Sequence, residues 1–346
     1  RDREEILEFE AGSEHELKIE LKPGSIDLSA VTVEARRPFS AASSKAVRDF
    51  DLKVRPVRSA QEMLQMVPGL IIAQHAGGGK AEQIFMRGFD ADHGTDIAVS
   101  VDGLPVNMVS HGHGQGYADL HWLIPETVEK VDFGKGPYNT SKGNFATAGY
   151  VNFRTKRGLE KSMIKLDAGR FNTLRTVGLF NLLNERNQHA YVAAEYLYSD
   201  GPFESSQNLN RINIMGKYTA GLRDGSTISL TASHFTSQWD ASGQIPDRAV
   251  KSGQITRFGA LDDTEGGYTD RTNIGLDFTK NVNDNLFVRN QVFYSYYDFE
   301  LYSNFTYFLE DTINGDQIRQ KESRQIFGVE SQLNYFTPVG GAEMNM

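Results

Sequence analysis

Hydrophobic and polar residues alternate with a period of two along most of the chain beyond residue 162. Ile212 and Ile214, for example, flank the polar Asn213, and the pattern continues to Lys217. Successive side chains of a β-strand point to opposite faces, so this period predicts strands with one apolar and one polar face. Eight such segments can be counted, at residues 164–168, 173–183, 190–196, 212–217, 228–233, 274–279, 288–296 and 327–335.

The connections between these strands alternate in length. A soluble β-sandwich would show the same alternation of side chains, but short turns at one end and long loops at the other are typical of outer-membrane barrels. Short turns are predicted at 184–187, 223–225 and 281–285, and long loops at 200–208, 240–270 and 299–323. We therefore predict antiparallel transmembrane β-barrel strands with their apolar face toward lipid. Their polar face, toward the lumen, carries Lys165, Asp167, Glu195, Lys217, Asp277, Arg289 and Glu330.

The preceding stretch, residues 59–156, mixes helical and strand patterns. Met63, Leu64 and Val67 fall on one face of a short helix predicted over residues 59–67. Ser59 is its expected N-cap, with an acidic residue three positions later as in a capping box. Strands are predicted at 70–72, 84–86, 97–101 and 130–133, and a second short helix at 124–128. The pattern indicates a compact α+β domain of ordinary size.

Composition narrows the class of protein. The chain has 346 residues, a formal net charge of −9 and a mean hydropathy of −0.45. No apolar run approaches the roughly 18–20 residues of a transmembrane helix, which argues against a helical membrane protein. The criterion does not detect the strands of a β-barrel, because apolar and polar residues alternate in them and their mean hydropathy is low. The absence of cysteine excludes disulfides and thiolate metal sites, and the acidic balance argues against a nucleic-acid partner.

Five short motifs follow one another in the first half of the chain. They are VPGL (67–70), FMRGF (85–89), VDGLPV (101–106), IPETVEKVDFGKGP (124–137) and GYVNFRTK (149–156). Their order and spacing resemble the plug domain of TonB-dependent outer-membrane receptors. The resemblance implies a plug domain at residues 59–156 and the first strands of a β-barrel at residues 157–346. The plug would close the barrel, and the protein would lie in the bacterial outer membrane. It also implies outer-membrane lipid and TonB, with its inner-membrane energising complex, as partners, and no cofactor.

The N-terminal region is predicted to contain two further parts. Residues 1–25 read as two strands and are similar to the tail of a carboxypeptidase-regulatory-like β-sandwich extension. Residues 26–58 read as a linker that begins with a segment resembling the TonB box: Leu28, Ser29, Ala30, Val31, Thr32 and Val33. Such an apolar segment can pair with the sheet edge of a partner by β-augmentation. The alternative is that it forms the last strand of the preceding sandwich.

The strand count bears on the extent of the chain. Barrels that hold a plug have about 22 strands, and eight cannot enclose a domain of this size. No signal peptide is visible at the first residues, and residues 340–346 look like a turn. We therefore expect a portion of a longer receptor. The predicted fold class is mixed: a short N-terminal β-sandwich tail, a small α+β plug domain, and the strands of an incomplete antiparallel transmembrane β-barrel.

Four of the eight histidines lie close together in the plug region, at His93, His111, His113 and His121. Imidazole binds Zn, Cu, Ni and Fe, and a carboxylate can complete the coordination shell. His111 and His113 would share one face if they lay on a strand. These residues are therefore candidates for binding a metal ion. The alternative is that they form hydrogen bonds between plug and barrel within a Gly-rich loop.

Three polar residues of the plug motifs, Arg87, Glu126 and Lys130, are predicted to anchor the plug to the barrel wall. Solvated contacts of this kind are individually weak, so modest force could rearrange them. The alternative for each is a solvated surface charge.

The predicted function is TonB-dependent active uptake of a scarce extracellular ligand, such as a metal ion or metal chelate, by a protein that is not an enzyme. One alternative is an outer-membrane component of a glycan or peptide uptake complex with a surface lipoprotein. The other is a metalloenzyme built on the histidines, which measured turnover would reveal.

Overall fold

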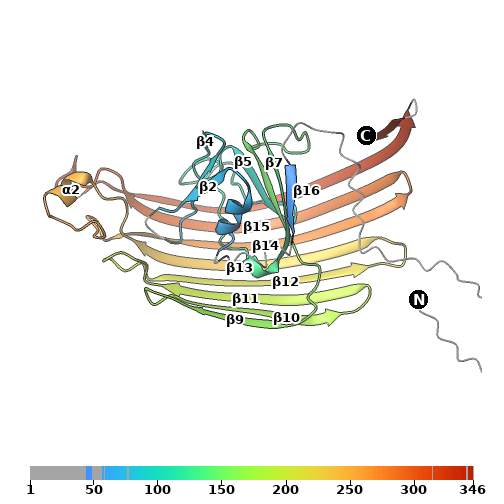
Figure 1. The fold of residues 1–346 in the computed structure, drawn as a ribbon, viewed down its shortest axis with the longest axis horizontal. Coiled ribbons are helices and arrows are strands. Elements are labelled where there is room, and N and C mark those ends of the chain that lie inside the picture. The colour runs from blue at the N-terminus through green and yellow to red at the C-terminus, as the bar shows by residue number, and fades with distance from the viewer. Residues whose placement is uncertain are drawn as a thin grey trace, which may run out of the picture. The chain divides into compact units, whose positions relative to one another are not determined.

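The computed structural model describes residues 44–48, 57, 59–75, 78–313, 315–339 and 342–345. All of them belong to one compact unit, Ala41–Met346. Within this unit a small mixed domain lies against one face of a large curved antiparallel sheet (Figure 1). The predicted sandwich tail at 1–25 and the predicted TonB box at 28–33 lie outside the described residues.

The small domain, called the plug below, contains two sheets and two short helices. One sheet has the order β1-β7-β8-β5-β6 and the other has the order β2-β3-β4. β5 and β8 are parallel, and the remaining pairs are antiparallel. The elements are β1 (Ser44–Arg48), η1 (Gln61–Met66), β2 (Leu70–Ala73), β3 (Gln83–Met86), β4 (Phe89–Asp90), β5 (Ile97–Val101), β6 (Leu104–Pro105), η2 (Pro125–Thr127), β7 (Val128–Lys135) and β8 (Gly149–Thr155).

Two features of the plug differ from the sequence prediction. Residues 44–48, which were assigned to the linker, form β1 and pair with β7. The first helix, predicted over residues 59–67, is a shorter 3-10 segment at Gln61–Met66. The Ser59 hydroxyl oxygen accepts a hydrogen bond from the Glu62 amide at 3.3 Å, although Ala60 occupies the N-cap position. Gly69, with φ of +84°, allows the chain to turn out of the helix.

The plug core forms where the apolar faces of these elements meet. Met63 and Leu64 of η1, and Val67 directly after it, are fully buried, as the helical spacing predicted. In β5 every second residue is buried, because one face of the strand points into the core. The core also includes Ile84, Ile97, Val99, Val131, Val151 and Phe153.

The large sheet is called the barrel sheet below. Its strands follow sequence order from β9 to β17. They are β9 (Met163–Ala168), β10 (Leu174–Asn184), β11 (Gln188–Ser199), β12 (Leu209–Gly221), β13 (Thr227–Ala241), β14 (Glu265–Asn283), β15 (Leu286–Asn304), β16 (Gln317–Val339) and β17 (Ala342–Asn345). β9–β16 are the eight predicted strands. β17 lies where a turn was predicted, and it pairs with β16.

The connections of the barrel sheet alternate as expected, but the strands are longer than the alternation alone indicated. β13 reaches Ala241 and β14 begins at Glu265, so the loop predicted over 240–270 is shorter and contains α2 (Asp247–Lys251). Aromatic and polar residues extend the strands beyond the clearly alternating positions. No helix in the described part of the chain is both long and apolar enough to cross a membrane.

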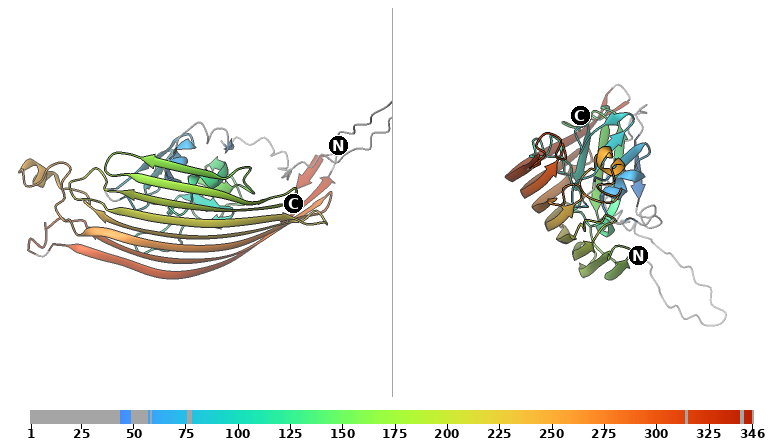
Figure 2. Two further views of the ribbon diagram at one scale, coloured as in Figure 1. Left: turned by 90° about the horizontal axis from the view of Figure 1, so that it is seen from below. Right: turned by 90° about the vertical axis from the view of Figure 1, so that its left-hand side faces the viewer.

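The two faces of the barrel sheet have opposite character. In β12, Ile212 and Ile214 are exposed on the convex face, whereas Arg211, Asn213 and Lys217 are buried on the face that the plug covers. Figure 2 shows the long strands from the convex side and the plug on the other side. Further exposed apolar side chains are Ile164, Leu166, Leu182, Leu230, Ile274, Leu276, Val292, Phe327, Val329 and Leu333. Apolar outside and polar inside is the pattern of a transmembrane barrel.

Candidate functional site between plug and barrel sheet

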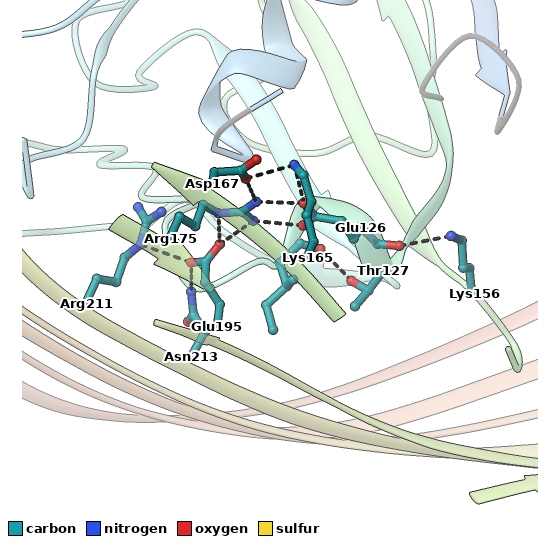
Figure 3. A network of polar contacts seen from close by, with 10 residues as sticks. Glu126, Thr127, Lys156, Lys165, Asp167, Arg175, Glu195, Arg211 and Asn213 are labelled. Atoms are coloured by element: carbon teal, nitrogen blue, oxygen red, sulfur yellow. Dashed lines mark hydrogen bonds and ion pairs between the residues drawn. The ribbon is translucent and has the colours of Figure 1, made fainter. Parts of the chain in front are cut away.

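Glu126 of η2 connects the plug to the barrel sheet. Arg175 of β10 donates to the two carboxylate oxygens of Glu126 from its Nη1 and Nη2 atoms, at 2.7 and 2.8 Å. Lys165 of β9 lies 3.3 Å from the same carboxylate. Two parallel bonds from a guanidinium fix orientation as well as charge, so η2 is held in one position (Figure 3).

The same arginine continues into a buried network within the barrel sheet. Arg175 Nε donates to Glu195 of β11 at 2.7 Å, and Arg211 Nε donates to the other Glu195 oxygen at 3.2 Å. Asn213 donates both to Glu195 and to the backbone carbonyl of His121 in the plug, at 3.0 and 2.8 Å. The side chains of Arg175 and Glu195 are only 2% and 1% exposed. The anchor is therefore buried rather than solvated, contrary to the sequence-based expectation.

The charge state of Glu126 follows from these contacts. Burial alone would raise the pKa of its carboxyl group, but the hydrogen bonds from Arg175 and the positive charges of Arg175 and Lys165 outweigh burial. The pKa of Glu126 consequently lies below its ordinary value. The carboxylate is ionised at neutral pH, as an ion-pair anchor requires.

A second polar contact lies at the turn after β5. Asp102 has φ of +50°, and its carboxylate accepts from the Thr155 amide at 2.9 Å and from Lys217 Nζ of β12 at 3.1 Å. Its backbone carbonyl accepts from Gln291 of β15 at 2.7 Å. One turn residue is thus bonded to the plug and to two barrel strands.

A third contact combines stacking and hydrogen bonding. The guanidinium of Arg271, on β14, lies 4.8 Å from the centre of a Trp122 ring in the plug. Its Nη2 donates to the backbone carbonyl of Pro105 at 3.0 Å. Arg271 is 2% exposed, so this cation–π contact is shielded from water and stronger than a surface one.

The other two predicted anchors lie elsewhere. Arg87 is exposed in the turn between β3 and β4, with φ of +52°. Lys130 forms an ion pair with Asp132, two residues along the same strand, at 2.8 Å. Glu126 is thus the predicted anchor for which the described residues show an ion pair with a barrel strand.

The predicted histidine group divides into separate environments. His121 is buried and lies 2.9 Å from the Asp119 carboxylate. Burial opposes charge on His121, but Asp119 outweighs it and the pKa of the imidazole is raised. His111 stacks on Tyr117 with ring centres 4.0 Å apart, and its Nε2 lies 2.9 Å from the hydroxyl of Tyr297 on β15. Both residues therefore have structural partners, and residues 110–114 form an irregular loop instead of a strand.

His93 and His113 do come together. Their Nε2 atoms are 3.2 Å apart, and the ring centres of His93 and His75 are 5.3 Å apart. Burial, which is the largest cause, together with the positive charge of Lys80 and the neighbouring histidines lowers the pKa of His93 to about 3. The imidazole of His93 is therefore neutral at physiological pH.

These rings border a cavity of about 190 Å³ between the plug and the barrel sheet. The plug contributes His75, Lys80, Asp92, His93 and His113, and the barrel sheet contributes Trp239 and Glu265 among others. Sequence reasoning missed His75, Lys80 and Glu265, because they lie outside the segment in which histidines are dense. A cavity of this size with polar lining residues can hold a small polar molecule or an ion.

The loop that carries His113 is attached to β16. The Gly112 amide donates to the Glu322 carboxylate at 2.6 Å, and the Gln320 amide donates to the Gly112 carbonyl at 2.9 Å. The sequence predicted Gln320 and Glu322 to lie in the loop over 299–323 rather than in a strand, and no local sequence signal linked them to a loop about two hundred residues earlier.

Comparisons with known proteins identify the fold. Residues 39–150 match the family model of the TonB-dependent Receptor Plug Domain. The unliganded ferric citrate transporter FecA is 14% identical, with a TM-score of 0.73 over 88% of this chain and 46% of that chain. The chain has the fold of a TonB-dependent outer-membrane receptor. The open form of the ferric-catecholate import receptor Fiu from E. coli K12 is 16% identical, with a TM-score of 0.65 over 88% of this chain and 48% of that one.

The copper transporter OprC is also similar to this chain, with 19% identity and a TM-score of 0.63 over 84% of this chain and 42% of that one. The chain thus spans less than half the length of each of these structures. At such identities the likeness concerns the fold. These similar proteins are named as transporters and a receptor.

Proposed function

We propose that this receptor takes up a scarce ligand across the bacterial outer membrane in a TonB-dependent manner. The ligand binds in the cavity between the plug and the long-loop end of the barrel sheet. The segment at residues 28–33 then becomes available to TonB, which pairs with it by strand addition. Work supplied through TonB moves the plug, and the ligand passes. The location in the outer membrane is part of this proposal.

The observation that carries the proposal is the buried attachment of the plug to the barrel sheet. Glu126, Asp102 and Trp122 each contact a different part of the sheet. A domain held by several directional bonds blocks passage until those bonds are exchanged. Breaking a buried ion pair costs about 3–5 kcal/mol, so spontaneous opening would be rare. An external source of work, as TonB provides in this family, would meet that cost.

The experiment that tests the proposal does not require the ligand to be known. Residues 1–346 contain no cysteine, so Val31→Cys adds the one thiol of this region to the proposed box, and any cysteine elsewhere in the full-length receptor is replaced by serine. We expect this thiol to form a disulfide with a cysteine placed in the C-terminal domain of TonB in cells. Ser13→Cys, in the predicted N-terminal extension, is the matched control and should not react.

A functional test uses the same position. Val31→Pro removes a backbone donor and blocks strand addition, whereas Val31→Ile retains the strand preference. We expect Val31→Pro to abolish energy-dependent accumulation of a panel of metal ions and ferric chelates, and Val31→Ile to retain it. Equal crosslinking at Ser13 and Val31, or full uptake by Val31→Pro, would contradict the proposal. A glycan or peptide ligand would appear as crosslinking without accumulation of any metal.

A further inference from the structure

The pair His93 and His113 has the geometry of half a metal site. A tetrahedral ion bound to two imidazole nitrogens at about 2.0–2.1 Å holds those nitrogens about 3.3 Å apart. The observed separation of the two Nε2 atoms is 3.2 Å. The ring centre of His93 lies 4.9 Å from that of His113 and 5.3 Å from that of His75. Two imidazoles that share a tetrahedral ion have their ring centres about 5 Å apart.

Hydrogen bonds fix His113 in the tautomer that a metal requires. Gln320 donates through Nε2 to the Gly112 carbonyl at 2.9 Å, which turns its Oε1 toward His113. That oxygen can only accept, so His113 donates from Nδ1 at 2.9 Å. The Nε2 atom of neutral His113 therefore keeps its lone pair. A ligating histidine commonly donates its other ring nitrogen to an oxygen in this way.

The surroundings supply further donors. The Asp92 carboxylate lies 3.5 Å from His93 Nε2. His75 Nε2 and His93 Nδ1 are buried without a hydrogen-bond partner among the residues that the structure describes. Within those residues no three histidine or acidic side chains already surround one point. The preformed part is thus a pair, and His75, whose ring centre lies 5.3 Å from that of His93, is the nearest candidate for a third nitrogen ligand.

We propose that His93 and His113 bind a divalent transition-metal ion through their Nε2 atoms, with His75 as the third ligand. The inference rests on the proposed uptake function and specifies its ligand. Binding requires His93 to carry its ring proton on Nδ1, so that both Nε2 lone pairs face the ion. Imidazole donors suit Cu²⁺, Ni²⁺ and Zn²⁺. A ferric ion saturated by a hexadentate chelator has no open position for them.

The same cavity indicates the form in which the ion arrives. Lys80 lines it beside the histidines, and its ammonium group repels a bare cation but attracts the carboxylates of a chelator. The volume of about 190 Å³ is many times the roughly 10–15 Å³ that a cavity needs to hold one water, so there is room for more than a single ion. A small anionic chelator can therefore remain on the ion, with the imidazoles in its open positions.

The test is calorimetric titration of the full-length receptor in detergent with Zn²⁺, Cu²⁺ and Ni²⁺, each as the simple salt and as the citrate complex. We expect one ion per receptor. His113→Asn should weaken binding more than tenfold, because asparagine can keep the bond to Gln320 but lacks Nε2. His93→Ala should do the same. The control is His234→Asn, which removes an exposed imidazole on β13 outside the cavity and should leave binding unchanged.

The result that overturns the proposal is the absence of binding in all six titrations, or binding that His113→Asn leaves unchanged. Far-UV circular dichroism of each variant excludes loss of fold as the cause. Tighter binding of the citrate complexes than of the salts supports the role of Lys80, and Lys80→Gln should abolish that difference. Loss of metal binding with an intact Val31→Cys crosslink to TonB rejects the metal site alone. Metal binding without the crosslink rejects the uptake mechanism alone.

Discussion

The substitution Arg175→Met tests how strongly the plug is held. Around this residue three acidic groups, Glu126, Asp167 and Glu195, face three basic ones, Lys165, Arg175 and Arg211. The six charges balance. Methionine fills similar space but leaves three negative charges against two positive ones. Glu195, 1% exposed, then retains Arg211 and Asn213, whereas Glu126 loses its two-point contact.

The expected magnitude follows from burial. Removing one partner of a buried ion pair costs about 3–5 kcal/mol, because the other charge stays unpaired in a medium that solvates it poorly. Glu126→Gln keeps the shape and one acceptor but loses the charge, so we expect a smaller cost of about 1.5–3 kcal/mol. The exposed pair Lys251–Asp247, with side chains 76% and 75% exposed, is the control. Lys251→Met should leave stability unchanged, since exposed pairs contribute little.

The assay is urea unfolding of the detergent-solubilised receptor, followed by tryptophan fluorescence. Trp122 contacts the barrel sheet from the plug, and Trp239 faces the plug from β13, so release of the plug changes both environments. With a urea slope of about 1–3 kcal/mol per molar, Arg175→Met should lower the midpoint by at least about 1 M. Gel migration of unheated samples checks that the barrel remains folded. A cost for Arg175→Met no larger than that for Lys251→Met would refute the argument.

Three further predictions concern the plug. Gly79→Ala should lower the free energy of unfolding by about 1–3 kcal/mol or more, because a Cβ atom at Gly79 would lie 2.0 Å from the Trp239 ring. Gly143→Ala is the control: a Cβ atom there would have no neighbour within 4 Å, so this variant should be neutral in the same urea assay. The pKa of His121 is raised in the folded protein. The stability that this shift contributes is fully present below the ordinary histidine pKa and is lost as pH rises through the folded-state pKa. The urea midpoint should therefore be lower at pH 8.5 than at pH 6, and His121→Gln should remove this pH-dependent part. Lys217→Met should lower stability by about 1–3 kcal/mol by leaving Asp102 without its barrel cation, and a midpoint equal to that of wild type would show that solvent replaces the contact.

The sequence alone predicted the local structure of this protein: its strands, the faces of those strands and the turns of the plug. The period of two in β9–β16 assigned each side chain to a face, because strand geometry leaves only two directions. The order of five motifs resembled that of a plug domain, and several of these motifs contain a turn whose backbone conformation few residues allow. Gly69 after η1 and Asp102 after β5 are such positions. Strand lengths were underestimated, because hydrogen-bond pairing with neighbours extends a strand past its alternating core.

Partners across the interface required the tertiary structure. Glu126 and Arg175 are 49 positions apart, and nothing in either local sequence distinguishes their pairing from that of two solvated charges. His111 and His113 illustrate the same limit, because a spacing of two predicts a shared face only on a strand. In the observed loop one ring stacks on Tyr117 and the other meets His93. The sequence therefore determined the secondary-structure elements and the faces of the strands, because both depend on local backbone sterics. Tertiary packing decided which buried polar groups meet.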